Sequence, residues 1–236
     1  MKLLAVALLI SLSYTTYAQD AVLVFSRTKG YRHASIGAGK VALMKMGQAN
    51  KFRADTTEDA NAFTPENLKK YKAVIFLSTT GNVLDTVQQQ AFEQYIRQGG
   101  GYVGIHAAAD TEYNWPWYNQ LCGAYFLSHP KQQDAEIMVI DKKHPSTKGL
   151  PDRWKRFDEW YSYKSIVAGP TVLAKLDEKT YQGGANGDNH PIAWYRNFDG
   201  GRSFYTGLGH TDASYVEPLF LEHLLGGIRW TMGKAK

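Results

Sequence analysis

Three short apolar runs constrain the fold of this chain more than any other feature. Residues 21–25, 73–77 and 102–105 carry no charged side chain and almost no polar group. Such runs are typical of strands in a parallel sheet, because those strands are covered on both faces. Helical spacing of apolar residues appears at 36–48 and 86–98, and parallel strands require crossover connections of this kind. The pattern predicts a doubly wound α/β domain with a mostly parallel sheet and helices on both faces.

The rest of the chain adds weaker signals. A strand is expected at 52–55, and Thr64 followed by Pro65 is a typical helix start. Beyond residue 106 we expect strands at 135–140 and 171–176, a hairpin of 192–196 with 203–208, and a final helix at 219–232. No internal repeat or linker divides the chain, so the sequence predicts a single domain over residues 19–236.

The first 18 residues have the features of a secretory signal peptide. Lys2 precedes an apolar run at 3–10, and small residues lead to Ala18, after which cleavage is expected. The alternative, a membrane anchor, needs a longer run to cross about 30 Å of hydrocarbon. We therefore predict a periplasmic or secreted protein with no membrane span.

Composition excludes several classes of partner and cofactor. The chain has 27 basic and 22 acidic residues without any block of Lys or Arg, so no nucleic-acid partner is expected. Neither a phosphate-binding loop nor a G-x-G-x-x-G motif follows a predicted strand, so no nucleotide cofactor is expected. The single Cys122 cannot form an internal disulfide, and its surroundings indicate a buried, inert thiol.

The first candidate catalytic residue is His106. It ends the apolar run 102–105 and is followed by three alanines, an arrangement typical of a strained strand-to-helix turn that presents one side chain above a sheet. Hydrolases place Ser or Cys at such a turn, so the usual acyl-enzyme chemistry is not available here. The positive end of the following helix should lower the pKa of the imidazole, which would make it a neutral base or a metal ligand.

Two further groups complete the predicted catalytic set. His210 follows a strand and two glycines, and Asp212 stands two positions later, where it is expected to orient the imidazole. Glu159 lies among aromatic residues, and burial would raise its pKa and suit it to acid or base work. No paired cysteines or H-E-x-x-H motif marks a metal, but His106 and His210 could hold a divalent ion together with Asp110 or Glu159.

The predicted substrate-binding residues are rings and polar groups in loops. Their members are Arg27, His33, Asp110, Trp115, Trp160, His190 and Trp194. Tryptophans beside polar residues suit stacking against sugar faces, whereas the alternative is a core layer beneath long loops. For His33 and His190 the alternative is a structural role within their loops.

Five segments together resemble the ThuA-like (trehalose utilisation) family: residues 25–33, 100–106, 158–161, 190–194 and 207–210. The resemblance implies a flavodoxin-like sheet akin to that of class I glutamine amidotransferases. Those enzymes carry Cys at the position of His106 and His-x-Glu at the position of His210-Thr211-Asp212, so glutaminase activity is not expected. The family is linked to sugar catabolism, including routes through 3-keto glycosides.

The leading hypothesis is an exported enzyme that processes a carbohydrate, such as a 3-keto glycoside, by acid–base or metal-assisted chemistry. His106 or His210 would remove the proton beside the ketone, and Glu159 would protonate the leaving group. The alternative is a sugar-binding module without catalysis. A third possibility, an interaction protein on the same fold, predicts that the loops after Ser26, His106 and Leu208 do not converge.

Overall fold

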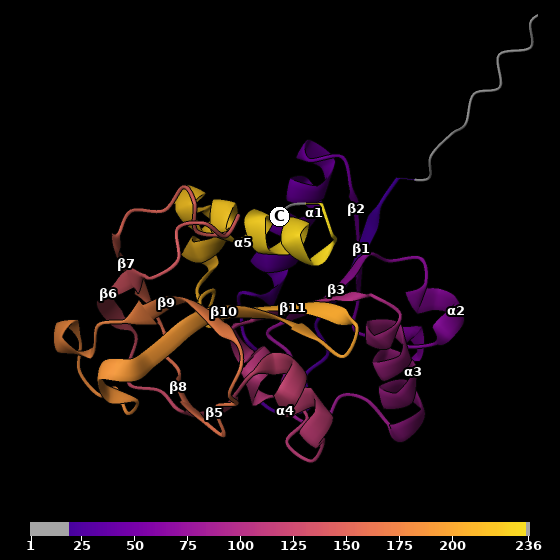
Figure 1. Cartoon of the computed structure of the whole chain (residues 1–236), viewed down its shortest axis with the longest axis horizontal. Helices are drawn as coiled ribbons and strands as arrows, with labels where there is room; N and C mark the ends of the chain where they lie inside the picture. The colour runs from indigo at the N-terminus through magenta and orange to yellow at the C-terminus, as the bar shows by residue number, and fades with distance from the viewer. Residues whose placement is uncertain (1–18, 235–236) are drawn as a thin grey trace, which may run out of the picture.

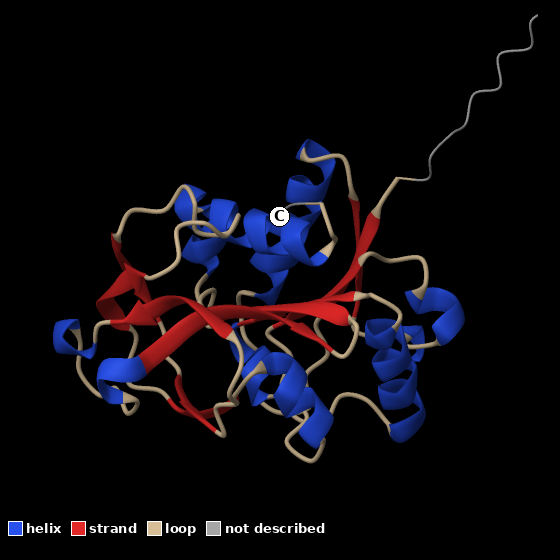
Figure 2. Ribbon diagram, in the orientation of Figure 1, coloured by secondary structure: helices blue, strands red, loops and turns tan. Residues whose placement is uncertain are grey.

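The computed structural model describes residues 19–234. The proposed signal peptide, residues 1–18, lies outside them. A nine-stranded sheet with the order β2-β1-β3-β4-β11-β10-β9-β6-β7 runs through the molecule, as Figures 1 and 2 show. The predicted fold class, a doubly wound α/β domain with helices on both faces, is confirmed.

The first half of the sheet is parallel. Its strands are β1 (Ala21–Phe25), β2 (Arg53–Thr57), β3 (Ala73–Leu77), β4 (Gly101–Ile105) and β11 (Gly201–Thr206). Strands β1, β3 and β4 are buried along their whole length, which explains their unbroken apolar sequences. The three apolar runs are therefore central strands, as predicted.

The second half of the sheet is antiparallel. It contains β10 (His190–Phe198), β9 (Thr171–Leu176), β6 (Gln133–Val139) and β7 (Arg153–Asp158). The predicted hairpin is present as β10 and β11, which turn at Asp199 and Gly200, both with positive φ. A separate two-stranded sheet, β5 (Tyr125–Ser128) with β8 (Ser162–Lys164), was not predicted.

Helices cover both faces of the sheet (Figures 1 and 2). On one face lie α1 (Ile36–Ala49) and α5 (Pro218–Thr231). On the other lie α2 (Pro65–Leu68), α3 (Thr86–Arg97) and α4 (Pro116–Cys122). No helix among residues 19–234 has both the length and the apolar character needed to cross a bilayer.

The core beneath α3 and α4 is built mainly of aromatic rings. Phe76 of β3 packs against Phe25, Phe92 and Tyr102 at centroid distances of 5.3–5.5 Å. Cys122 lies in the same core as a free thiol, and burial raises its pKa to about 12. The predicted burial of this cysteine is thus confirmed, and a thiol with so high a pKa is a poor nucleophile.

The carboxyl ends of β1, β4 and β11 meet at one edge of the sheet. The loop after β11 crosses this edge through Gly209, whose φ is +105°. A Cβ there would lie 2.9 Å from the Tyr215 hydroxyl and 3.0 Å from Phe220. Only glycine combines this backbone conformation with so close an approach.

We predict that Gly209→Ala lowers the free energy of unfolding by about 2–4 kcal/mol, because both backbone strain and a steric clash are introduced. Gly99→Ala is the matched control. Gly99 has a similar φ of +94°, but a Cβ there has no neighbour within 4 Å, so only about 1 kcal/mol should be lost. Urea denaturation measures both values, and equal losses would contradict the close packing of Gly209.

Candidate functional site

His106 begins a short 3-10 helix (His106–Asp110) directly after β4, with φ of +51°. The strained turn predicted from the sequence is present, although the helix that follows is one turn of 3-10 helix. Two contacts hold the turn. The Tyr205 hydroxyl donates to the His106 carbonyl at 2.7 Å, and His106 Nδ1 donates to the Gly207 carbonyl at 2.9 Å.

His210 is positioned by a buried carboxylate, that of Asp158 at the end of β7. Asp158 Oδ2 accepts from the Gly209 amide at 2.9 Å, and Oδ1 accepts from the His210 amide at 3.1 Å. Arg156 pairs with the same carboxylate at 3.0 Å, and both side chains are buried. The loop after β11 is therefore fixed to the far half of the sheet through its backbone.

The two imidazoles meet although 104 residues separate them. His106 Nε2 lies 3.0 Å from His210 Nδ1. Glu159 completes the group, with Oε2 3.0 Å from His210 Nδ1 and 3.4 Å from His106 Nε2. The predicted convergence of His106, His210 and Glu159 is confirmed, and we call these residues the His–Glu triangle.

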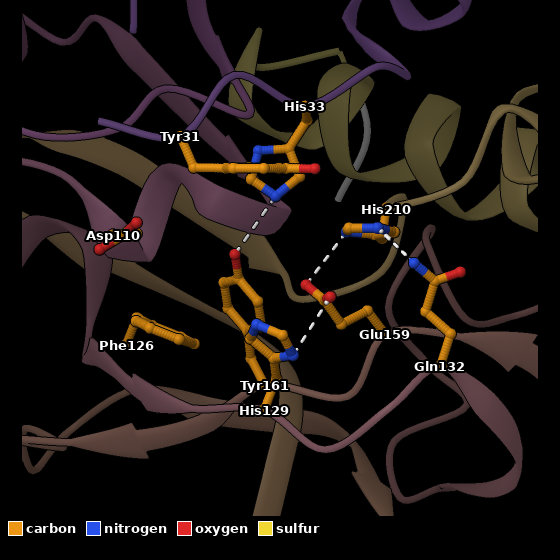
Figure 3. A pocket seen from close by; sticks show the side chains of 9 residues that line it. All are labelled: Tyr31, His33, Asp110, Phe126, His129, Gln132, Glu159, Tyr161 and His210. Atoms are coloured by element: carbon orange, nitrogen blue, oxygen red, sulfur yellow. Dashed lines mark hydrogen bonds and ion pairs between the residues drawn. The ribbon is translucent and has the colours of Figure 1, made fainter. Parts of the chain in front are cut away.

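The partners of each imidazole fix its tautomer. A carbonyl only accepts, so His106 carries its proton on Nδ1 and presents a lone pair at Nε2. The Gln132 amide nitrogen donates to His210 Nε2 at 2.8 Å, which leaves the His210 proton on Nδ1 (Figure 3). The proton on His210 Nδ1 therefore lies among three atoms that can accept it: His210 Nδ1 itself, His106 Nε2 and Glu159 Oε2.

The pKa of Glu159 is shifted in the direction opposite to our expectation. Burial acts to raise this pKa, but the interactions with the His106 and His210 imidazoles outweigh burial and hold the pKa well below its ordinary value. His129 adds a contact to Oε1 at 3.2 Å. Glu159 is therefore a carboxylate, and it is unsuited to donating a proton.

His33 lies over the His–Glu triangle. Its ring lies edge-on to His106 and His210, with centroid distances of 4.8 and 5.1 Å. Burial, followed by electrostatic repulsion between a protonated His33 and the His106 and His210 imidazoles, lowers its pKa to about 3. His33 is thus a neutral imidazole, and it lies 3.4 Å from the Tyr161 hydroxyl (Figure 3).

A cavity of about 360 Å³ opens above this group. Rings of Tyr31, Phe126 and Tyr161 line it together with polar groups, among them Asp110 (Figure 3). Burial raises the pKa of Asp110, although the Tyr113 hydroxyl donates to it at 2.6 Å and acts in the opposite direction. The cavity therefore holds one carboxyl group with a raised pKa and one, Glu159, with a lowered pKa.

The three predicted tryptophans do not line this cavity. Each is buried, and each indole donates to a structural partner: Trp115 to Glu93, Trp160 to the Gln133 carbonyl and Trp194 to the Cys122 carbonyl. They belong to the core, which was the alternative interpretation. The rings available to a ligand are Tyr31, Phe126 and Tyr161.

Three other predicted residues also lie apart from the cavity. Asp212 is exposed at the start of a 3-10 helix, and within residues 19–234 no hydrogen bond or ion pair joins it to His210. Arg27 donates to the Val83 carbonyl and borders a different depression. His190 is buried and bonds to the Tyr161 carbonyl and to Glu178, so it supports the wall of the cavity.

Sequence reasoning missed several residues that shape the site. They are Tyr31, Phe126, His129 and Gln132, which line the cavity, and Asp158, which holds the loop after β11. Tyr31 lies in the polar loop after β1, close in sequence to His33, and Asp158 directly precedes Glu159. Their nearness in the sequence to predicted site residues could have identified them. Nothing in the local sequence distinguishes His129 or Gln132 from ordinary loop residues.

Comparisons with known proteins agree with this description. The family described as trehalose utilisation, ThuA, matches residues 21–231. A ThuA-like protein from Bacteroides uniformis is 29% identical, with a TM-score of 0.80 over 95% of this chain and 96% of that one. A ThuA-like protein from Parabacteroides merdae is 22% identical, with a TM-score of 0.78 over 93% and 92%.

A more distant structure shares the fold alone. It is a β-galactosidase from Bacillus circulans, 16% identical, with a TM-score of 0.59 over 91% of this chain and 31% of that one. Among curated proteins no sequence matches significantly. Because the family match extends over nearly the whole described chain, this protein belongs to the ThuA family.

Proposed function

We propose that this protein is an exported enzyme that cleaves a glycoside whose sugar ring has been oxidised to a ketone, as in a 3-keto glycoside. Membership in the trehalose utilisation family points to a carbohydrate-related role. The observation that carries the proposal is the His–Glu triangle of His106, His210 and Glu159. It lies below a cavity lined by the rings of Tyr31, Phe126 and Tyr161. Aromatic walls with a few convergent polar groups are typical of small-molecule sites.

The size of the cavity fits a sugar. Small-molecule pockets range over about 300–1,000 Å³, and this one is near the lower limit. Tyr31 is 66% exposed, so its ring is available to stack on a sugar at the mouth of the cavity. A monosaccharide unit at the floor with its leaving group toward the mouth matches this shape.

The chemistry uses the lone pair of an imidazole. A ketone acidifies the neighbouring C–H bond, and the imidazole takes this proton as the electron pair forms a carbon–carbon double bond. The glycosidic oxygen then leaves with the electrons of its bond to the sugar. The carboxylate of Glu159, 3.0 Å from His210 Nδ1, stabilises the imidazolium that forms.

Asp110 supplies the second proton transfer. Its raised pKa keeps a proton on the carboxyl group at higher pH than an exposed aspartate would, and it faces the cavity. We assign it as the acid that protonates the departing oxygen, the role first expected of Glu159. Two carboxyl groups with pKa values shifted in opposite directions are the usual signature of such a division of roles.

We predict that His106→Ala and His210→Ala each lower kcat/KM for a 3-keto glycoside by about 10²- to 10⁴-fold, because each removes part of the base. Asp212→Asn is the matched control and should stay within about twofold, because Asp212 is exposed and lies apart from His210. Product formation is measured by chromatography, with circular dichroism to check folding. Sugar binding without turnover by the unmutated protein would instead identify a binding module.

We predict that Asp110→Asn abolishes the alkaline limb of the pH profile of kcat/KM, because that limb reports loss of the acid's proton. Its activity should fall strongly toward an alkyl glycoside and little toward a nitrophenyl glycoside, whose phenolate leaves without protonation. Both substrates are used in the 3-keto form. Equal losses on the two substrates would remove Asp110 from this role.

Export is tested on the amino terminus of the mature protein. We predict that protein recovered from outside the cytoplasm begins at Gln19, because cleavage is expected after Ala18. Ala18→Arg should accumulate as the uncleaved precursor, since a small residue is needed there. Recovery of the unmutated chain from the cytoplasm with Met1 intact would contradict this prediction.

A further inference from the structure

We propose that His33, His106, Glu159 and His210 form a binding site for a divalent transition-metal ion at the floor of the cavity. Each of the four offers one ligand atom, and these atoms all lie within 4.8 Å of one another. They come from four separate segments of the chain that meet only in the folded protein. The proposal concerns binding and is tested without any sugar, although three of the four residues are those of the proposed function.

The distances between the donor atoms of the His–Glu triangle match those between ligand atoms around a metal ion. Its three donor atoms are separated by 3.0, 3.0 and 3.4 Å. Donors held about 2.1 Å from an ion lie about 3.0 Å apart when the angle at the metal is a right angle, and about 3.4 Å apart when it is tetrahedral. An ion placed over the triangle therefore reaches all three atoms without movement of the backbone.

Each member of the triangle also makes a contact through the atom that faces away from the proposed ion, as metal ligands usually do. His106 Nδ1 donates to the Gly207 carbonyl, and this directs the Nε2 lone pair toward the centre. Glu159 leaves Oε2 free for an ion because His129 contacts the other oxygen. His210 Nε2 is bonded to Gln132.

His33 provides the fourth ligand from the loop after β1. Its side chain is 3% exposed, and its Nδ1 has no hydrogen-bond partner among residues 19–234. A buried imidazole with an unpaired nitrogen is unfavourable unless another group satisfies it. Its ligand atom lies within 4.8 Å of the ligand atoms of the other three residues.

The donor set selects the kind of ion. Three imidazoles and one carboxylate suit Zn²⁺, Co²⁺ or Ni²⁺, whereas Mg²⁺ and Ca²⁺ prefer oxygen ligands. The single negative charge of Glu159 leaves the complex cationic, so an oxygen atom of a sugar is attracted to any open position. The ion would then polarise the sugar carbonyl, and water bound to the ion would supply the base in place of an imidazole.

Binding at His210 requires its proton to move from Nδ1 to Nε2. The Gln132 amide then rotates by half a turn, so that Oε1 accepts this proton. Gln132 is exposed, and both orientations are open to it. A carboxylate at this position would accept the proton more strongly and increase the basicity of Nδ1, as in carboxylate–histidine–metal arrangements.

The test is isothermal titration calorimetry of the purified, metal-stripped protein with Zn²⁺, Co²⁺, Ni²⁺ and Mg²⁺, without any sugar. We expect one ion of each transition metal per chain and no binding of Mg²⁺. Co²⁺ should give the visible absorption of a site with nitrogen ligands. Saturation with Mg²⁺ at comparable affinity, or no binding of any of the three transition metals, would overturn the proposal.

Variants locate the ion. Glu159→Gln and His33→Gln should each weaken Zn²⁺ binding by about 10- to 100-fold or more, whereas Gln132→Glu should tighten it by about 10-fold or more. Asp212→Asn is the control, because Asp212 is exposed and lies apart from the four ligands; its affinity should stay within about threefold. Because Gln132→Glu changes an exposed residue, it tests the site even where a ligand variant fails to fold. Unchanged affinity in Gln132→Glu together with a large loss in Asp212→Asn would place the ion elsewhere.

Discussion

The pairing of β4 with β11 is the contact on which the site depends. The two strands run parallel with Ile105 opposite Thr206, so the residues that follow them, His106 and Gly207, emerge side by side. The hydrogen bond from His106 Nδ1 to the Gly207 carbonyl continues this pairing beyond the strands. Because side chains alternate between the faces of a sheet, a slip of one residue would turn every buried side chain of β11 to the other face. The register that buries the core therefore also brings the two imidazoles together.

A second constraint joins the two halves of the sheet. Asp158 is the last residue of β7, the edge strand of the antiparallel half. Its carboxylate accepts hydrogen bonds from the backbone of the loop that follows β11 in the parallel half. The adjacent Glu159 thereby reaches His210. A buried charge is costly unless it is paired and hydrogen-bonded, and Arg156 together with the two backbone amides meets this requirement. The contacts of Asp158 thus place the carboxylate of the next residue, Glu159, beside His210.

Much of the fold follows from the sequence because local patterns report burial. Residues 21–25, 73–77 and 102–105 are apolar throughout because both of their faces are covered, and the glycines around His210 signal a close approach of the backbone. The partner of His210 could not be found in this way. Asp212 is near it in the sequence, yet the start of a 3-10 helix leaves this side chain in solvent, and Glu159 takes its place through tertiary packing. The pKa of Glu159 was misjudged for a related reason: burial can be inferred from neighbouring residues, but the imidazoles that outweigh it come from other strands.

The turn at His106 has a consequence for the side chains that this position can carry. Its backbone is held in the left-handed region by the Tyr205 hydroxyl and by the pairing of the neighbouring strands, and the Tyr205 contact is made through the His106 carbonyl. These contacts involve only the backbone of residue 106, so they fix the direction of its side chain and do not depend on the chemical nature of that side chain. The backbone contacts at this position would therefore hold a thiol, a hydroxyl or an imidazole equally well at the carboxyl end of β4.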